Sequence, residues 1–360
     1  MNVKQFRKIA CILPIACFIT IVRVCLHSKT MGVQRIKLKG NCSTYSQQVH
    51  LENKTMLDPL YCTRMQLQNY QLCDKAVYDL RIIVIVYNRY QSLLRLLDSL
   101  NAASYNGDDV KLEVWIDRSV NDSLDELTVK AAKSFIFLHG KYQVIPHVQH
   151  AGIFGQWIST WRPEKENSEI AVLLEDDLTV SKFFYRYLKL VHKKYDAYPY
   201  INGYTLQRLS MVHHIKENTP PPLESKESVF LYPVIGSWGF SPSRDNWVHF
   251  QNWFKTVCDN KTLSLYIPNN KISMWYTGRE QRSDEVWTVW HMYHAYINSE
   301  YTLYTNIPGH LGLSTNWREK GLHYKSHFGK TNKLLQNWLD DFENLPAKPS
   351  MVDLSGQILH

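Results

Sequence analysis

The stretch IAVLLEDD, residues 170–177, constrains the fold of this chain more than any other feature. Its five apolar residues favour a strand that is buried on both faces of a parallel sheet. Ligands of open α/β sheets bind at the carboxyl ends of such strands. Glu175, Asp176 and Asp177 stand at that end, so they are predicted to line a binding site. The alternative is that the acids only precede a helix capped by Ser181, but a cap needs one acid and not three.

The three adjacent carboxylates also predict a bound cation. Carboxylates packed together repel one another unless a cation lies among them, and a cluster of oxygen ligands suits Mn²⁺ or Mg²⁺. The formal charge of +8 is spread along the 360 residues without a long Lys/Arg block. It therefore favours anionic ligands in general and does not indicate nucleic acid.

Alternating strands and helices surround the acids and predict a parallel sheet with helices on its faces. The predicted strands are residues 81–87, 110–116, 142–148 and the one that begins at Ile170. The predicted helices are residues 91–100, 124–137 and a short one within 152–161. No GxGxxG or GxxxxGK[ST] motif is present, so neither a classical dinucleotide fold nor a P-loop is indicated.

Beyond this half the pattern becomes mixed. Predicted helices cover residues 181–198 and 246–258, and a third is opened by residues 282–287; predicted strands cover 203–208, 229–234 and 301–305. The Gly- and His-rich stretch 308–328 favours a mobile loop over a site. Residues 346–360 are predicted to form a flexible tail.

The N-terminus predicts a membrane anchor. Residues 1–8 are basic, and residues 9–26 are apolar apart from Thr20 and Arg23. That length is near the minimum for a membrane-spanning helix, and no small-x-small cleavage site follows it. The prediction is a cytosolic tail, a signal-anchor over 9–26 and a lumenal stem over 27–78. A cleaved signal peptide is the alternative, since basic residues on both sides make the positive-inside rule of little help.

Sequons and cysteines add weight to a lumenal chain. Four Asn-x-Ser/Thr sequons are present, at Asn41, Asn53, Asn121 and Asn260. Four cysteines lie outside the predicted span: Cys42, Cys62, Cys73 and Cys258. They allow one or two disulfides in three connectivities, of which a Cys62–Cys73 pair closes the shortest loop.

Four stretches resemble a family of known enzymes. They are IVIVYNR at 83–89, WID at 115–117, EDD at 175–177 and LSTNWREKG at 313–321. Together with the anchor and stem they resemble a Golgi glycosyltransferase of the GT-A fold, similar to the β-1,2-N-acetylglucosaminyltransferase I family and its relatives. The resemblance implies an α/β GT-A catalytic domain over 79–345, with a Rossmann-like nucleotide-sugar-binding half and an acceptor-binding half.

The resemblance implies a metal site of Mn²⁺ or Mg²⁺ on the acids. Asp177 is predicted to contact the metal because it stands furthest out of the strand. Glu175 and Asp176 would bind through water or hold the ribose of the nucleotide sugar. His310 would complete the metal shell, as a late histidine does in many GT-A enzymes; alternatively it is an ordinary loop residue.

The same resemblance implies three contacts to the nucleotide sugar. Asp117 would read the uracil, or alternatively cap a helix or turn. Arg89 would pair with phosphate through its planar guanidinium, or alternatively be a surface arginine. Ser314 lies in the stretch that resembles the loop closing over the sugar nucleotide.

Inverting glycosyl transfer needs a base that takes the acceptor's hydroxyl proton. Asp284 and Glu285 are the candidates, because they open a helix late in the domain, on the side expected to meet the acceptor. Adjacent carboxylates also raise each other's pKa, which suits a base. Glu285 is favoured because it lies one residue nearer Trp287. As first-turn acids of a helix they would need no function.

The resulting hypothesis is a single-pass type II Golgi membrane enzyme. It would move a sugar, with N-acetylglucosamine the best candidate, from a UDP-sugar donor to a glycan or glycoprotein acceptor. The alternative is a catalytically inactive lumenal module that binds sugar or nucleotide on the same fold. The family has cysteines close to the first two strands where this chain has Tyr87 and Arg118, so the disulfide framework differs.

Overall fold

The computed structural model describes residues 77–164, 168–209, 227–260, 262–278, 286–320, 325–326 and 329–359. The chain divides into two units, 1–54 and 55–360, and every described residue belongs to the second. The predicted cytosolic tail (1–8), the predicted anchor (9–26) and the predicted stem as far as residue 76 lie outside the described residues. Among the helices that the structure describes, none has the length and apolar character needed to cross a membrane.

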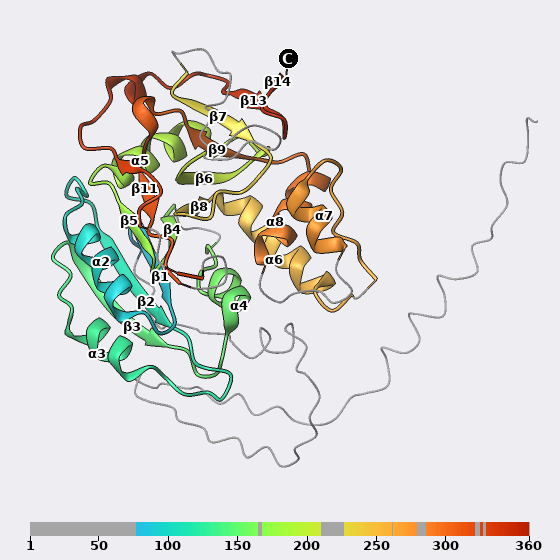
Figure 1. The fold of residues 1–360 in the computed structure, drawn as a ribbon. Helices are drawn as coiled ribbons and strands as arrows, with labels where there is room; N and C mark the ends of the chain where they lie inside the picture. The colour runs from blue at the N-terminus through green and yellow to red at the C-terminus, as the bar shows by residue number, and fades with distance from the viewer. Residues whose placement is uncertain are drawn as a thin grey trace, which may run out of the picture. The chain divides into compact units, whose positions relative to one another are not determined.

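The first half of the described unit is a parallel α/β arrangement, as the alternating pattern predicted (Figure 1). Its strands are β1 (Leu80–Val86), β2 (Val110–Ile116), β3 (Gly140–Pro146) and β4 (Ile170–Glu175). They pair in the order β4-β1-β2-β3, and all three pairings are parallel. The intervening helices are α2 (Tyr90–Asn101), α3 (Glu126–Ser134) and α4 (Gly152–Ser159).

The sheet continues beyond β4 into a mixed second half, to ten strands in all in the described unit. The order is β4, β8 (Phe240–Pro242), β6 (Ile201–Arg208), β9 (Tyr301–Thr305), β7 (Val229–Tyr232), β13 (Ser350–Val352) and β14 (Ile358–Leu359). β8 is antiparallel to both of its neighbours, whereas β6 and β9 are parallel. The fold class is therefore α/β with a mixed sheet.

The chain end corrects one prediction. Residues 346–360 were expected to form a flexible tail, but β13 pairs in parallel with β7 and antiparallel with β14. Strands of two or three residues are too short to show a period-2 pattern, so the sequence carried no signal for them.

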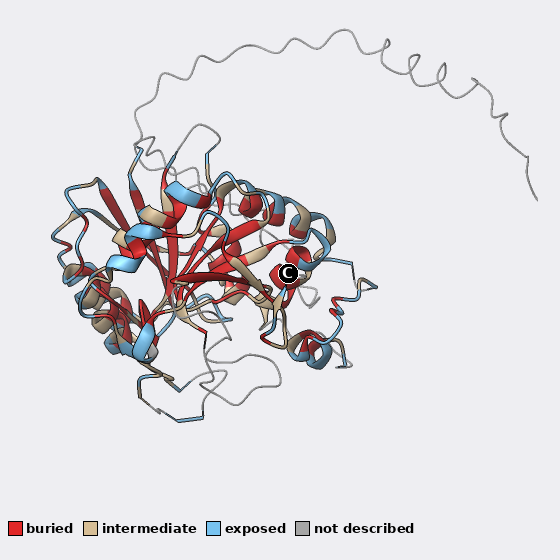
Figure 2. Cartoon of the chain, turned by 90° about the horizontal axis from the view of Figure 1, so that it is seen from above, coloured by how far each residue is buried: buried red, intermediate tan, exposed pale blue. Residues whose placement is uncertain are grey.

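A hydrophobic core lies on each face of the sheet. Along β1, Ile82 and Val84 face one core and Ile83 and Ile85 face the other, which is why the strand is apolar throughout. The first core takes residues from α2 and α5 (Phe184–Tyr195), and the second from α4, α6 (Arg244–Val257), α7 (Lys271–Thr277) and α8 (Trp287–Ile297). Figure 2 shows the strands as the most continuously buried part of the unit.

The stretch predicted to be a mobile loop, 308–328, is also corrected in its first part. It forms the short helix η1 (Pro308–His310), then β10 (Leu311–Gly312) and β11 (Ser314–Asn316). β10 pairs with β12 (Lys333–Leu334), and β11 pairs antiparallel with β5 (Leu178–Val180), the strand that follows the acids. Backbone pairing with a segment more than 130 residues earlier cannot be read from local periodicity.

Two smaller predictions can be compared with the structure. Ser181 does not cap the following helix, which has Phe183 at its N-cap; the Ser181 hydroxyl donates to Leu335 O at 2.7 Å. Cys258, at the C-cap of α6, forms a disulfide, and its partner lies outside the described residues. This agrees with the expectation of one or two disulfides.

The buried histidine His291 on α8 generates a prediction about acid stability. It is 3% exposed and packed among the rings of Phe240, Trp247 and Phe250, and burial lowers its pKa from 6.5 to about 3. A depressed histidine pKa stabilises the folded state above pH 6.5, and this contribution is lost as the pH falls. The free energy of unfolding should therefore drop by about 2 kcal/mol between pH 6.5 and 5 through this residue.

The measurement is urea unfolding across that pH range with His291→Leu beside the wild type. The variant should show a shallower pH dependence than the wild type over that range. Equal slopes in His291→Leu and the wild type would show that His291 is not the group responsible.

Candidate functional site

The acids lie at the carboxyl end of β4, where the sequence predicted a site. Ile85 of β1 is paired with Glu175, so the end of β1 and the residues after it lie beside the acids. Arg89, three residues beyond β1, donates from Nε to Asp176 Oδ2 at 3.0 Å and from Nη2 to Asp176 Oδ1. Its Nη1 lies 3.5 Å from Asp177 Oδ2. Arg89 and the acids are thus brought together, with a carboxylate and not a phosphate as the arginine's partner in this structure.

Each of the other two acids has its own donor. Asp177 Oδ1 accepts from Asn316 Nδ2 at 3.0 Å, and the Asp177 backbone carbonyl accepts from Trp317 N at 2.9 Å. Glu175 Oε1 accepts from Trp157 Nε1 on α4 at 2.9 Å. The site is therefore assembled from β4, the end of β1, α4 and the β11 segment.

Charge in this site is not balanced by the described side chains. Burial raises the pKa of Glu175 from 4.5 to about 8, and the charge of Asp177 adds to the shift. Burial also raises the pKa values of Asp176 and Asp177, although Arg89 opposes both shifts. Three carboxylates face one guanidinium, so a further cation would relieve the excess negative charge.

The donor set fits one mode of divalent metal binding. Among the described residues, no group of three or more His, Cys, Asp or Glu side chains is arranged to hold a metal ion. Mg²⁺ and similar ions are, however, commonly held by one or two carboxylates together with substrate phosphates and water. Asp177, at 8% exposure against 2% for Asp176, is the more accessible aspartate and fits that mode. The side chain of the other predicted ligand, His310, lies outside the described residues.

Asp117 takes the alternative role that the sequence left open for it. It follows β2 and is 4% exposed. Its Oδ1 accepts from Arg118 N at 2.8 Å and Ala151 N at 2.7 Å, and its Oδ2 accepts from Gly152 N at 2.8 Å. Asp117 thus satisfies backbone N–H groups where α4 begins, as a cap does. A contact between Asp117 and uracil remains a prediction.

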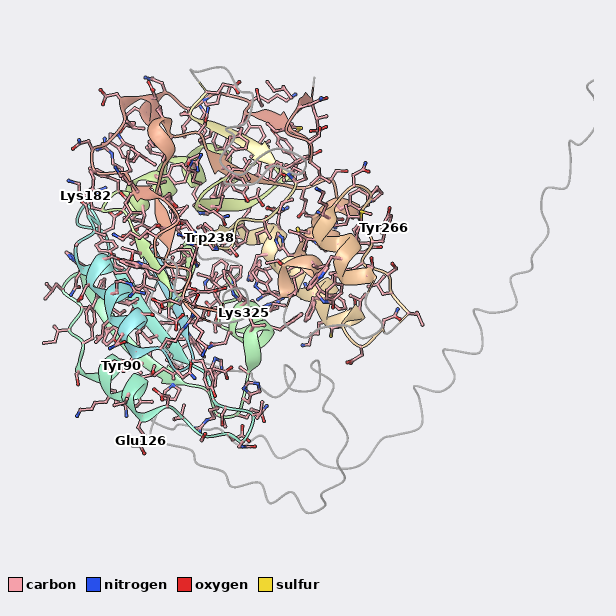
Figure 3. The ribbon with its side chains drawn as sticks, in the orientation of Figure 1. Tyr90, Glu126, Lys182, Trp238, Tyr266 and Lys325 are labelled. Atoms are coloured by element: carbon pink, nitrogen blue, oxygen red, sulfur yellow. The ribbon has the colours of Figure 1, made fainter. Side chains whose placement is uncertain are left out.

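Ser314 lies beneath the site and not at its surface. It is fully buried, and its hydroxyl donates to the backbone carbonyl of Trp238 at 2.5 Å (Trp238 is labelled in Figure 3). In this arrangement its side chain holds β11 against the loop that precedes β8. The Ser314 contact to a nucleotide sugar was predicted from sequence and depends on a different side-chain arrangement.

Residues 314–320, called the strap below, run across the acids and are fastened to α2. Arg95 of α2 donates to Glu319 Oε1 at 2.5 Å, and its guanidinium lies 4.2 Å from the centroid of the Trp317 ring. Trp317 Nε1 donates to Thr179 Oγ1 of β5 at 2.7 Å. The sequence had singled out this stretch through its family resemblance, but not Asn316 or Glu319 as individual residues.

The predicted bases Asp284 and Glu285 lie outside the described residues. The described chain resumes at Val286, the N-cap of α8, and Trp287 is the first residue of that helix. Its ring stacks on that of Trp157 with centroids 4.4 Å apart, and Trp157 donates to Glu175. The start of α8 therefore packs next to a residue that contacts the acids.

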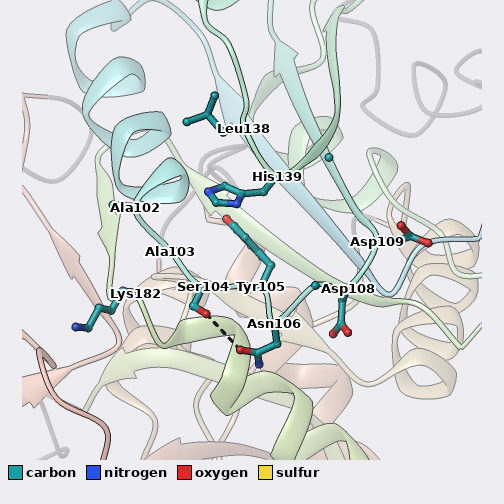
Figure 4. A pocket seen from close by; sticks show the side chains of 12 residues that line it. Ala102, Ala103, Ser104, Tyr105, Asn106, Asp108, Asp109, Leu138, His139 and Lys182 are labelled. Atoms are coloured by element: carbon teal, nitrogen blue, oxygen red, sulfur yellow. Dashed lines mark hydrogen bonds between the residues drawn. The ribbon is translucent and has the colours of Figure 1, made fainter.

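A cavity of about 690 Å³ lies elsewhere in the unit (Figure 4). It is lined by residues 102–109 and 138–140 and by Lys182. Most of the lining belongs to the segments that lead into β2 and β3, at the amino ends of these strands, and Lys182 lies after β5, whereas the acids lie at the carboxyl end of β4. The cavity is therefore not part of the candidate site.

Comparisons with known proteins give partial structural likenesses only. No protein-family model matches the chain, and no curated protein matches its sequence. A mannosyltransferase from Pyrobaculum calidifontis, solved with GDP-Man and Mn²⁺, aligns over 51% of this chain and 50% of its own, at 12% identity and a TM-score of 0.32. S. aureus TarS 1–349 aligns over 63% and 60%, at 12% identity and 0.34.

Mouse xyloside xylosyltransferase 1 aligns over 50% of this chain and 75% of its own, at 13% identity and a TM-score of 0.30. The chain thus spans between half and three fifths of the mannosyltransferase and TarS structures. Scores of this size describe partial overlaps of the fold, and the case for a function depends on the residues of the site itself.

The Arg89–Asp176 pair generates a stability prediction. Replacing Arg89 by Met should leave Asp176 buried without its two-pronged partner and lower the free energy of unfolding by about 3 kcal/mol. Adding Asp176→Asn should recover much of that loss, because it removes the uncompensated charge. Urea unfolding of the wild type, the single variant and the double variant measures both effects.

The matched control is Arg186→Met, which removes an arginine paired with Glu343 where both side chains are about two-fifths exposed. An exposed pair should contribute less than about 1 kcal/mol. A double variant no more stable than Arg89→Met would mean that the loss comes from packing and not from the buried charge.

Proposed function

We propose that this chain is a metal-dependent glycosyltransferase with a GT-A arrangement. It would move a sugar, with N-acetylglucosamine the best candidate, from a UDP-sugar to a hydroxyl of a glycan or glycoprotein, with inversion. The observation that carries the proposal is the acidic cluster at the carboxyl end of β4, where three carboxylates lie near one arginine at the edge where α/β sheets bind ligands. A divalent cation at that edge would compensate the excess negative charge of the carboxylates, and together with Arg89 it would favour binding of a diphosphate.

Asp177 would hold Mn²⁺ or Mg²⁺ together with the donor's phosphates. When bound, the metal would supply electrostatic stabilisation of the diphosphate as it leaves. Glu175 and Asp176 would act through water or the ribose. Arg89 lies within reach of both aspartates, so a shift of its guanidinium toward a bound phosphate would keep it near its present partners.

Glu285, with Asp284 second, would take the proton of the acceptor hydroxyl as the new C–O bond forms. The position of Trp287 supports this assignment, because it connects the start of α8 to Glu175 through Trp157. We further propose a type II Golgi membrane protein, anchored by residues 9–26 with a stem to residue 78 and a lumenal catalytic domain from residue 79.

The first test is binding of a panel of nucleotide sugars to the full-length chain, with and without Mn²⁺. One UDP-sugar should bind in a metal-dependent way. Asp177→Ala should weaken this binding by more than the roughly 10- to 100-fold that is typical when a residue hydrogen-bonded to a metal ligand is replaced. Asp98→Ala, an exposed carboxylate on α2, is the matched control and should bind as the wild type does. If Asp177→Ala bound the nucleotide sugar as strongly as the wild type, the acids would not form the donor-binding site.

The second test concerns the base. Glu285→Gln should lower kcat by about 10²- to 10⁴-fold while leaving the KM for the donor unchanged, because the base acts only on the acceptor proton. Asp284→Asn should have a smaller effect. Steady-state kinetics measure the effect of each variant on kcat and KM, and NMR of the product identifies its anomer. Normal turnover by Glu285→Gln, with a product that retains the donor's anomeric configuration, would contradict the assignment. Donor binding with no turnover on any acceptor would favour the inactive binding module instead.

A further inference from the structure

Asn316 lies directly against the proposed metal-binding aspartate. It is the last residue of β11 and is 4% exposed. Its Nδ2 donates to Asp177 Oδ1 at 3.0 Å. The contact joins the strap to the acidic turn across 139 positions of the chain.

The amide of Asn316 can present only its N–H side to Asp177. Its Oδ1 accepts from the backbone N–H of Arg318 at 2.6 Å, which fixes the orientation of the amide. Its backbone N–H donates to Thr331 Oγ1 at 3.2 Å, and its carbonyl accepts from Thr331 N at 3.0 Å. Both ends of the residue are thus held, and one of the two lone pairs of the amide oxygen is taken by the Arg318 N–H.

The two carboxylate oxygens of Asp177 have different neighbours in this geometry. Oδ1 accepts the hydrogen bond from Asn316, whereas Oδ2 lies 3.5 Å from Arg89 Nη1. A hydrogen bond to one oxygen of a carboxylate sets the rotation of the group and therefore the direction of the other oxygen. Backbone pairing adds to this, because Trp317 N donates to Asp177 O at 2.9 Å.

We infer, on the basis of the proposed metal-dependent function, that Asn316 is a positioning residue for the metal site. It orients Asp177 through Oδ1 so that Oδ2 faces a divalent cation. The late part of the chain then contributes to the metal site by donating a hydrogen bond to a ligand, independently of His310. The strap is consequently needed for metal affinity itself, even before any nucleotide sugar is bound.

The test is titration of Mn²⁺ into the metal-free full-length protein, followed by the EPR signal of free Mn²⁺. Asn316→Leu keeps nearly the same shape but removes the donor, and Asn316→Ser serves if the bulkier apolar group prevents folding. Both should weaken Mn²⁺ binding by about 10- to 100-fold. Asn332→Ala is the matched control. It removes a neighbouring amide that donates to Ser314 O and Lys333 O and so loosens the same segment without touching Asp177.

The outcomes separate this role from the proposed function. Mn²⁺ binding by the Asn316 variants at wild-type strength would overturn the role of Asn316 while leaving the metal site in place. An equal loss in Asn332→Ala would also overturn it, because general loosening of the strap would then explain the effect. Absence of Mn²⁺ binding in the wild type would overturn the proposed metal-dependent function and this role together. Weak binding confined to the Asn316 variants would support it.

Discussion

The ion pair between Arg89 and Asp176 joins the ends of two neighbouring strands at the point where both leave the sheet. Asp176 is 2% exposed, so its charge depends on a partner close by. That partner is available because β1 and β4 run parallel and in register, which places the residues after β1 beside the residues after β4. The Arg89–Asp176 pair is therefore a consequence of the strand order in the sheet, because its two members follow different strands.

The chain returns to the acidic turn much later. After β5 the chain forms β6, β7 and β9 in the second half of the ten-stranded sheet. β11 then pairs with β5, the strand that directly follows the acids. The strap closes over the turn through Asn316 and is fastened to α2 through Glu319 and Arg95. Helix α2, strand β4 and the strap thus form one connected unit, and movement of the strap would alter the surroundings of Asp177.

The opposite face connects the site to the helical part of the unit. Trp157 donates to Glu175 and stacks on Trp287, and its neighbours belong to the core shared by α4, α6 and α8. A displacement of Trp287 at the start of α8 would therefore alter the position of Trp157 and its hydrogen bond to Glu175. This is the physical basis for proposing that the residues just before α8 serve the same reaction.

The sequence by itself determined the strands and helices of the first half and the place of the acids. Long apolar runs such as that of β4 and amphipathic spacing such as that of α2 are local properties. It also indicated, through resemblance, that residues near 313–321 belong near the site. It could not show that Arg89 pairs with Asp176, that Asp117 caps the start of α4, or that Ser314 is buried, because each depends on which segments meet.

Only the tertiary structure decided these partners. β5, β8, β11 and β13 have three residues each, and such short strands are stabilised by hydrogen bonds to distant neighbours and not by their own pattern. The same holds for Asn316, whose side chain gains its role from a carboxylate 139 residues away. Local patterning decides where elements form, whereas the pairing of strand ends decides which side chains share a site.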